Sequence, residues 1–213
     1  MEYKELSPHS GYISEEPGLI CPKIGLIYGR GGTIYFDTGA SLKQLRLLEE
    51  VRAKKGFRNP SYLVISHFHA DHIANFAYFS TCRVYGSKTT AQRIRVDETV
   101  HETAAIDLGD VKVEIIPFPS SHAKGSLILR LVGEEVVFLG DGVYEAVGFE
   151  EKDYYDRSLF FEMALVIRSL NAAHYVFGHE SLLTVDDQKG MERFLGEMEG
   201  KIKAAGGPRF YVD

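Results

Sequence analysis

Five apolar, strand-like segments of this chain each end in a side chain that can bind or orient a metal ion. In mixed α/β proteins, ligands gather in crevices outside strand ends. We therefore expect these five end residues to converge on one edge of the fold, because chance would scatter them. The segments are TIYFD, YLVISH, VEIIPFPSSH, EEVVFLGD and HYVFGH, and they end at Asp37, His67, His122, Asp141 and His179.

The second segment runs directly into HFHADH, residues 67–72, which holds three histidines and one aspartate in six positions. His67 and His69 are two residues apart, so both project to one side of an extended segment and can share one cation. Asp71 and His72 are adjacent and enter a short predicted helix, IANFAYF, so they point elsewhere. The motif can thus serve two metal ions.

The candidate ligands divide into two sets and one shared carboxylate. Mixed imidazole and carboxylate ligands favour Zn(II), are compatible with Fe or Mn, and leave an open position for solvent. Asp37 is expected to orient a ligand histidine through a hydrogen bond rather than to bind metal, with a simple turn as the alternative. The first set is His67, His69 and His122, the second is Asp71, His72 and His179, and Asp141 bridges them.

Length and charge limit the class of protein. The 213 residues suit a single domain spanning 1–213. With 24 Lys and Arg against 30 Asp and Glu, the net charge of -6 favours a small-molecule substrate and argues against nucleic acid. The start is polar and acidic, and no apolar run approaches membrane-spanning length. Cys21 and Cys82 lack CxxC spacing, which fits a reducing compartment, so we expect a cytoplasmic protein without membrane contact.

Strand and helix signals alternate along the chain, which predicts an α/β protein. A hairpin is predicted over 23–39, with RGG in its turn, and a helix is predicted from Ser41 to Gly56. Antiparallel strands follow a short helix predicted over 87–98. The apolar segment 157–172 is predicted as a core helix, and an exposed face on it would instead indicate a homodimer. A last amphipathic helix ends at Gly206.

With YFDTG before it and PFPSSHAKGSL, VVFLGD and FGHE after it, HFHADH resembles the motifs of the metallo-β-lactamase-fold hydrolase superfamily. The resemblance covers residues 37–180 with all motifs in order. It implies a four-layer αββα sandwich with a dinuclear site at one sheet edge. It also assigns the two metal ions to the same two ligand sets, and Asp141 to the bridge.

Departures from the superfamily pattern concern the substrate. Asp141 stands where some true β-lactamases have cysteine, which favours the glyoxalase II, lactonase and persulfide dioxygenase branches. FGHE resembles glyoxalase II, but only 34 residues follow His179 (213 minus 179), too few for the helical substrate domain of that enzyme. Ser121 and Ala123 flank His122, where the family often has Gly and Thr.

The predicted function is a dinuclear metal-dependent hydrolase. Because metal binding lowers the pKa of water to about 7, a bridging hydroxide can attack an ester, thioester, lactone or amide of a small molecule. Asp71, Asp141 and Tyr144 are the catalytic candidates, with the Tyr144 hydroxyl as a donor to the developing oxyanion. Lys124 is a candidate for binding a substrate carboxylate. For Tyr144 and Lys124, an ordinary loop role is the alternative.

Two other functions remain alternatives. A mononuclear iron dioxygenase of the persulfide dioxygenase type would use His67, His122 and Asp141 alone. A non-catalytic binding module on the same fold would not require all seven ligand candidates.

Overall fold

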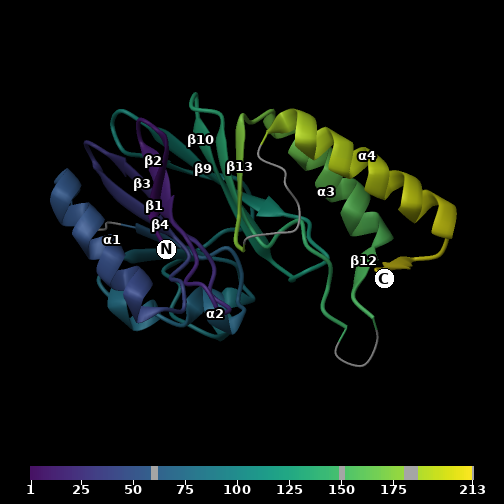
Figure 1. Cartoon of the computed structure of the whole chain (residues 1–213), viewed down its shortest axis with the longest axis horizontal. Coiled ribbons are helices and arrows are strands. Elements are labelled where there is room, and N and C mark those ends of the chain that lie inside the picture. The colour runs from purple at the N-terminus through teal and green to yellow at the C-terminus, as the bar shows by residue number, and fades with distance from the viewer. Residues whose placement is uncertain (59–61, 149–151, 180–186, 213) are drawn as a thin grey trace.

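Two β-sheets pack face to face between outer layers of helix in the computed structural model of this chain (Figure 1). The structure describes residues 1–58, 62–148, 152–179 and 187–212. One helix covers the outer face of the first sheet, and two helices cover the outer face of the second (Figure 1). This order of layers is the αββα sandwich that the resemblance to the metallo-β-lactamase fold implied.

The first sheet follows the chain strand by strand, in the order β1 to β7. Its first four strands pair antiparallel, whereas β4, β5, β6 and β7 are parallel. Helix α1 (Leu42–Lys55) makes the crossover between β4 and β5 that parallel pairing requires. The strands are β1 (Tyr3–Ser7), β2 (Ser10–Ile13), β3 (Ile24–Gly29), β4 (Gly32–Phe36), β5 (Tyr62–Val64), β6 (Arg83–Gly86) and β7 (Glu98–Thr99).

The second sheet has the order β13-β11-β10-β9-β8. Strands β8 to β11 form an antiparallel meander, and β13 lies parallel to β11. Helices α3 (Arg157–Leu170) and α4 (Gln188–Ala205) pack on its outer face. A separate small sheet pairs β12 (Tyr154–Asp156) with β14 (Arg209–Tyr211). The strands of the second sheet are β8 (Ala104–Asp107), β9 (Lys112–Phe118), β10 (Ser126–Val132), β11 (Val136–Gly140) and β13 (His174–Phe177).

Apolar side chains from both sheets fill the space between them. Phe36 and Val64 of the first sheet and Leu129 and Phe138 of the second lie in one buried cluster. Two further clusters lie beneath the helices, one under α1 and one under α3 and α4. The metal ligand candidates therefore follow strands that are anchored on both faces.

Helix ends agree with their sequence signals. The Ser41 hydroxyl accepts hydrogen bonds from the backbone N–H groups of Lys43 and Gln44, at 3.1 and 3.4 Å, and so caps α1. Gly56 ends this helix with φ of 67°, a conformation that glycine adopts without steric cost. Helix α4 ends at Gly206, as predicted.

Three segments differ from the sequence prediction. The helix expected over 87–98 is wrong, because only the 3₁₀ turn Thr90–Gln92 forms there. The helix expected over IANFAYF is interrupted: α2 (Ala70–Ile73) ends before the 3₁₀ segment Phe76–Phe79. The polar strands β1 and β2 were not predicted at all, because their sequences lack a continuous apolar run.

The apolar segment 157–172 forms α3, which buries one face in the core as predicted, although Leu165 on its outer face is 68% exposed. Cys21 and Cys82 are buried, and neither forms a disulfide. Within the described residues, no helix combines the length and the hydropathy that crossing a membrane would need.

Candidate metal centre

Strand ends from both sheets meet at one edge of the sandwich. The parallel strands β4 and β5 end just before Asp37 and His67, and the parallel strands β11 and β13 end just before Asp141 and His179. His122 follows β9 by a short loop. Parallel neighbours present their carboxyl ends at the same edge of a sheet, which is why these residues lie together.

The predicted ligands form three overlapping groups, in each of which the candidate ligand atoms lie within 4.8 Å of one another. The first and third groups coincide with the two sets expected from spacing. The remaining group links them, because it combines a histidine from each set with Asp141. The groups are His67, His69 and His122; His67, His72 and Asp141; and Asp71, His72 and His179.

The carboxylate of Asp141 lies between the two sets. Its Oδ2 is 3.4 Å from Nε2 of His122, which belongs to the first set. The same oxygen is 3.3 Å from Nε2 of His72 and 3.6 Å from Nε2 of His179, both of the second set. A single oxygen in this position can contact ions held by either set.

Buried polar atoms without a partner indicate what the centre fits. Among the described residues, Nε2 of His67, Nε2 of His72 and Oδ1 of Asp141 are buried and have no hydrogen-bond partner. Buried polar groups in native proteins are otherwise almost always paired. Imidazole nitrogen and carboxylate oxygen are the donors that Zn(II) binds, so this donor set fits divalent metal ions.

Asp37 fixes the orientation of His72. Its Oδ2 accepts from Nδ1 of His72 at 2.8 Å and from the Ser66 hydroxyl at 2.7 Å, while its Oδ1 accepts from the backbone N–H of Ser66 at 2.7 Å. Asp37 is 1% exposed and has φ of 64°, a left-handed conformation that Asp tolerates better than most residues. The structure thus gives Asp37 the contacts of an orienting residue.

The other candidate ligands contact either the backbone or one another. Nδ1 of His122 donates to the backbone carbonyl of Glu145 at 2.9 Å, so Nε2 carries the lone pair. That Nε2 lies 3.0 Å from Nδ1 of His69, a pair of ring nitrogens that one cation can share. Nε2 of His179 lies 3.1 Å from Oδ2 of Asp71.

The surroundings set the charge of these groups. Burial, and then the neighbouring histidines, hold the pKa of His67 well below its usual value, so its ring is neutral and able to bind metal. Burial opposes ionisation of Asp71, but the hydrogen bond from His179 and the charge of His72 outweigh it and lower the pKa of Asp71 to about 2. Burial likewise opposes ionisation of Asp141, and contacts with His72 lower its pKa nonetheless.

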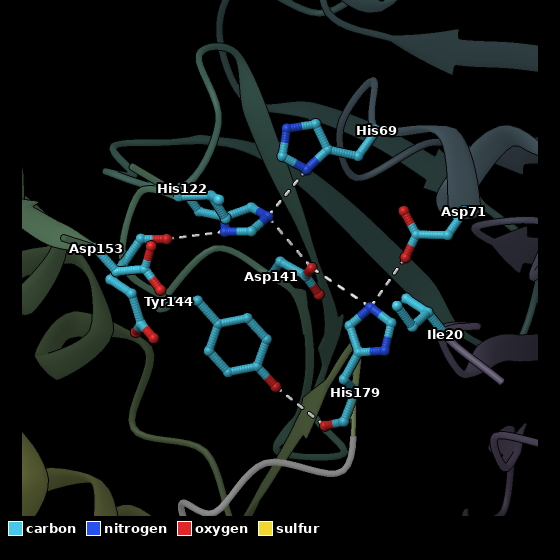
Figure 2. A pocket seen from close by; sticks show the side chains of 10 residues that line it. Ile20, His69, Asp71, His122, Asp141, Tyr144, Asp153 and His179 are labelled. Atoms are coloured by element: carbon cyan, nitrogen blue, oxygen red, sulfur yellow. Dashed lines mark hydrogen bonds and ion pairs between the residues drawn. The ribbon is translucent and has the colours of Figure 1, made fainter. Parts of the chain in front are cut away.

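A pocket of about 310 Å³ opens onto the centre (Figure 2). His67 and His72 do not line it, because they are 1% and 0% exposed and lie beneath the ligands that do. The volume suits a small molecule. The pocket is lined by Ile20, His69, Asp71, His122, Asp141, Tyr144, Glu145, Val147, Asp153 and His179.

Tyr144 and Lys124 differ in their position relative to the pocket. Tyr144 lines the pocket, but its hydroxyl donates to the backbone carbonyl of His179 at 3.0 Å, so its proton does not point to a substrate (Figure 2). Lys124 is exposed and is not among the described residues that line the pocket. Glu180, which completes the FGHE motif, lies outside the described residues.

Ser66 and Gly178 contribute to the centre and were not singled out from the sequence. The Ser66 hydroxyl lies 3.0 Å from Nδ1 of His67 and so links that ligand to Asp37. A Cβ atom at position 178 would clash with Oδ1 of Asp141, so only glycine fits there. Ser66 directly precedes His67, and Gly178 directly precedes His179. A small or polar residue directly before a candidate ligand histidine is the sequence signal that could have identified both.

Comparison with known proteins finds matches to parts of the chain. A model of the metallo-beta-lactamase superfamily matches residues 23–85, which include HFHADH. A hydroxyacylglutathione hydrolase from Mesorhizobium japonicum is 30% identical over 129 residues, which are 58% of this chain and 50% of that protein. The chain therefore spans about half the length of that relative.

Solved structures show the same fold at low sequence identity. A metallo-beta-lactamase from Pontibacter korlensis is similar with a TM-score of 0.68 and 17% identity, covering 92% of this chain and 97% of the other. The class B3 di-zinc metallo-beta-lactamase LRA-12 from an Alaskan soil metagenome has a TM-score of 0.71 and 17% identity, with 96% and 94% covered. The resemblance seen in the sequence is confirmed at the level of the fold: this chain has the metallo-β-lactamase fold, and residues 23–85 match the model of the metallo-beta-lactamase superfamily.

Proposed function

We propose that this chain is a dinuclear metal-dependent hydrolase that cleaves an ester, thioester, lactone or amide bond of a small molecule. The position of Asp141 carries the proposal. Its Oδ2 lies 3.3 to 3.6 Å from ring nitrogens of both ligand sets, so one carboxylate can serve two ions. A single ion would leave several of these buried ligand atoms without a partner.

Two divalent ions, with Zn(II) favoured and Fe or Mn compatible, would supply a water activated near neutral pH and a Lewis acid for the substrate carbonyl. One ion would be held by the first ligand set and the other by the second, with Asp141 shared. The ionised carboxylates of Asp71 and Asp141 offset part of the positive charge. The centre keeps a net positive charge that favours electron-rich carbonyl groups.

Neighbouring groups hold the histidine protons away from the pocket. Asp37 accepts the proton on Nδ1 of His72, and the Glu145 carbonyl accepts the proton on Nδ1 of His122. With metal bound, both rings would present a bare Nε2 to the centre. These tautomers are assigned from the hydrogen-bond partners, which also fix the rotation of each ring.

Two exposed apolar side chains line the pocket. Ile20 is 83% exposed and Val147 is 51% exposed, and both line the pocket. Such side chains gain free energy when a ligand covers them. The substrate is therefore expected to carry an apolar part next to the carbonyl that reacts.

The comparisons suggest where a substrate search begins. The relative from Mesorhizobium japonicum is named as a hydrolase of hydroxyacylglutathione. Thioesters accordingly come first in a screen, followed by lactones and activated esters. Because this chain spans about half of that relative, the screen includes glutathione thioesters but is not limited to them.

Metal analysis of protein purified without added metal tests the proposal. We expect about two equivalents of Zn, Fe or Mn per chain, as in two-metal hydrolases. In His179→Ala the bound metal should fall to about one equivalent, and hydrolysis should fall with it, because one ion loses a ligand. His174→Ala is the matched control, since His174 is an exposed histidine at the start of β13, the strand that His179 follows, and its loss should leave both values unchanged.

The same variant separates the hydrolase from the iron dioxygenase. A mononuclear iron site would use two histidines and one carboxylate, and His179 would lie outside it. A folded His179→Ala protein that keeps its full metal content, and consumes oxygen with a persulfide substrate, would overturn the hydrolase proposal.

A further inference from the structure

Three successive backbone carbonyls at the end of β13 each accept a hydrogen bond from another part of the chain. The Lys23 ammonium donates to the carbonyl of Phe177 at 3.3 Å. The backbone N–H of Lys23 donates to the carbonyl of Gly178 at 2.7 Å. The Tyr144 hydroxyl donates to the carbonyl of His179 at 3.0 Å (Figure 2). We name these three hydrogen bonds the carbonyl clamp.

The two donor residues come from different sheets. Lys23 directly precedes β3 of the first sheet, and its side chain is 11% exposed and paired with Glu15 at 3.6 Å. Tyr144 lies in the loop after β11 of the second sheet. Its ring stacks on Phe177, with centroids 6.1 Å apart and an interplanar angle of 20°. The clamp therefore ties the end of β13 to both sheets.

The position of His179, unlike that of the other two ligand candidates of its set, depends on how the two sheets pack. Asp71 and His72 come from one short motif of the first sheet, so their separation is set locally. His179 comes from the second sheet, and its Nε2 must reach Oδ2 of Asp71, 3.1 Å away. Its distance to that carboxylate depends on where the end of β13 lies relative to the first sheet.

The clamp and the pairing of β13 with β11 together set the position of the end of β13. The backbone N–H of Gly178 donates to the carbonyl of Gly140 at 2.7 Å, which holds β13 against β11. This contact and the Tyr144 hydrogen bond are both made within the second sheet. They fix the backbone of residues 178 and 179 to that sheet but do not set its distance to the first sheet. Among the hydrogen bonds of the described residues, those from Lys23 connect the first sheet to the backbone beside His179.

We propose that Lys23 and Tyr144 are positioning residues that place His179 for the second metal ion and so determine the affinity for that ion. The inference rests on the proposed dinuclear centre. It assigns the Tyr144 hydroxyl to the His179 backbone instead of to a substrate oxyanion. The first ligand set lies outside the clamp, so the affinity for the first ion should not depend on either donor.

Two substitutions remove the side-chain donors of the clamp, and Lys23→Met also removes the ion pair with Glu15. Tyr144→Phe keeps the ring that stacks on Phe177, and Lys23→Met keeps the backbone hydrogen bond to Gly178. Each variant should bind the second ion about ten-fold more weakly, the lower end of what loss of a supporting partner costs a metal site. Affinity for the first ion should equal that of the parent protein.

Zinc titration in competition with a chromophoric chelator measures both affinities. Tyr62→Phe and Lys203→Met are matched controls, because Tyr62 begins β5 at the end remote from the centre and Lys203 lies on α4. Unchanged second-ion affinity in both clamp variants would overturn the proposal. Equal weakening of both ions would overturn it too, since that result shows general destabilisation without a positioning role.

Amide hydrogen exchange in the metal-free protein gives a second readout. The N–H groups of Lys23 and Gly178 should exchange faster in the clamp variants than in the parent, because Gly178, the acceptor of the first bond and the donor of the second, is held less firmly. If the parent binds a single ion, the dinuclear function fails, and exchange alone then decides the clamp. Exchange rates equal to those of the parent would show that the clamp does not hold the end of β13.

Discussion

Substitution of Asp37 by Asn removes the charge of a buried carboxylate and leaves its shape unchanged. Asp37 is 1% exposed, and its two oxygens accept hydrogen bonds from the Ser66 N–H, the Ser66 hydroxyl and Nδ1 of His72. Its φ of 64° suits Asn as well as Asp, so the substitution adds no backbone strain. The effect should therefore come from the lost charge and the changed hydrogen bonds.

The magnitude follows from the atoms that Asn offers. An amide has one oxygen acceptor and one NH₂ donor. The oxygen can keep the bond from the Ser66 N–H, but the NH₂ group then faces Nδ1 of His72, which can accept only if its proton moves to Nε2. That tautomer blocks the nitrogen that would bind metal. Affinity for the second ion should fall by about 10- to 100-fold.

The metal-free protein should also lose stability. Hydrogen bonds to a charged group contribute about 1.5–3 kcal/mol, and we expect the free energy of unfolding to fall by about this amount. For a chain of this length, each kcal/mol lowers the melting temperature by about 2–4 °C. Urea unfolding of metal-free protein measures the first quantity, and zinc titration measures the affinity.

The matched control is Asp156→Asn. Asp156 caps α3 by accepting from the backbone N–H of Leu159 at 3.1 Å, and Asn caps helices about as well as Asp. This variant should resemble the parent in stability and in metal binding. Parental stability and parental second-ion affinity in Asp37→Asn would refute the orienting role of Asp37, as would equal losses in the two variants.

Two further outcomes follow from the centre. Exhaustive metal removal should abolish hydrolysis and re-addition of Zn(II) should restore it, because no side chain in the pocket is proposed as the nucleophile. Activity that persists without metal would contradict the proposed mechanism. Gly178→Ala should weaken binding of both ions, because the added Cβ would displace the shared Asp141 carboxylate. Metal analysis measures this, and intact binding of two ions would show that the carboxylate is not shared.

The sequence predicted those parts of the fold that depend on local signals. Ser41 and Gly56 mark the ends of α1 because capping chemistry acts within a few residues. The ligand candidates at strand ends could be identified because an apolar run that stops at His or Asp is recognisable without knowing which strands pair. The orienting role expected for Asp37 also agrees with its hydrogen bond to His72.

Contacts across long distances in the chain could not be predicted in this way. Lys23 lies 154 residues from the Phe177 carbonyl that it contacts, and nothing near it in the sequence marks it as part of the centre. The acceptor of the Tyr144 hydroxyl is a backbone carbonyl, which every residue has, so the sequence could not identify it. Strands β1 and β2 were missed because tertiary pairing overrides their weak local propensity.

The division of each proposed ligand set between two sheets also links metal binding to folding. An ion that binds the folded chain and not the unfolded chain stabilises it by about 2.7 kcal/mol when its free concentration is a hundred times its dissociation constant. His122 and His179 follow strands of one sheet, whereas HFHADH follows a strand of the other. Each ion would therefore act as a non-covalent cross-link, and metal depletion would lower the free energy needed to separate the two halves of the sandwich.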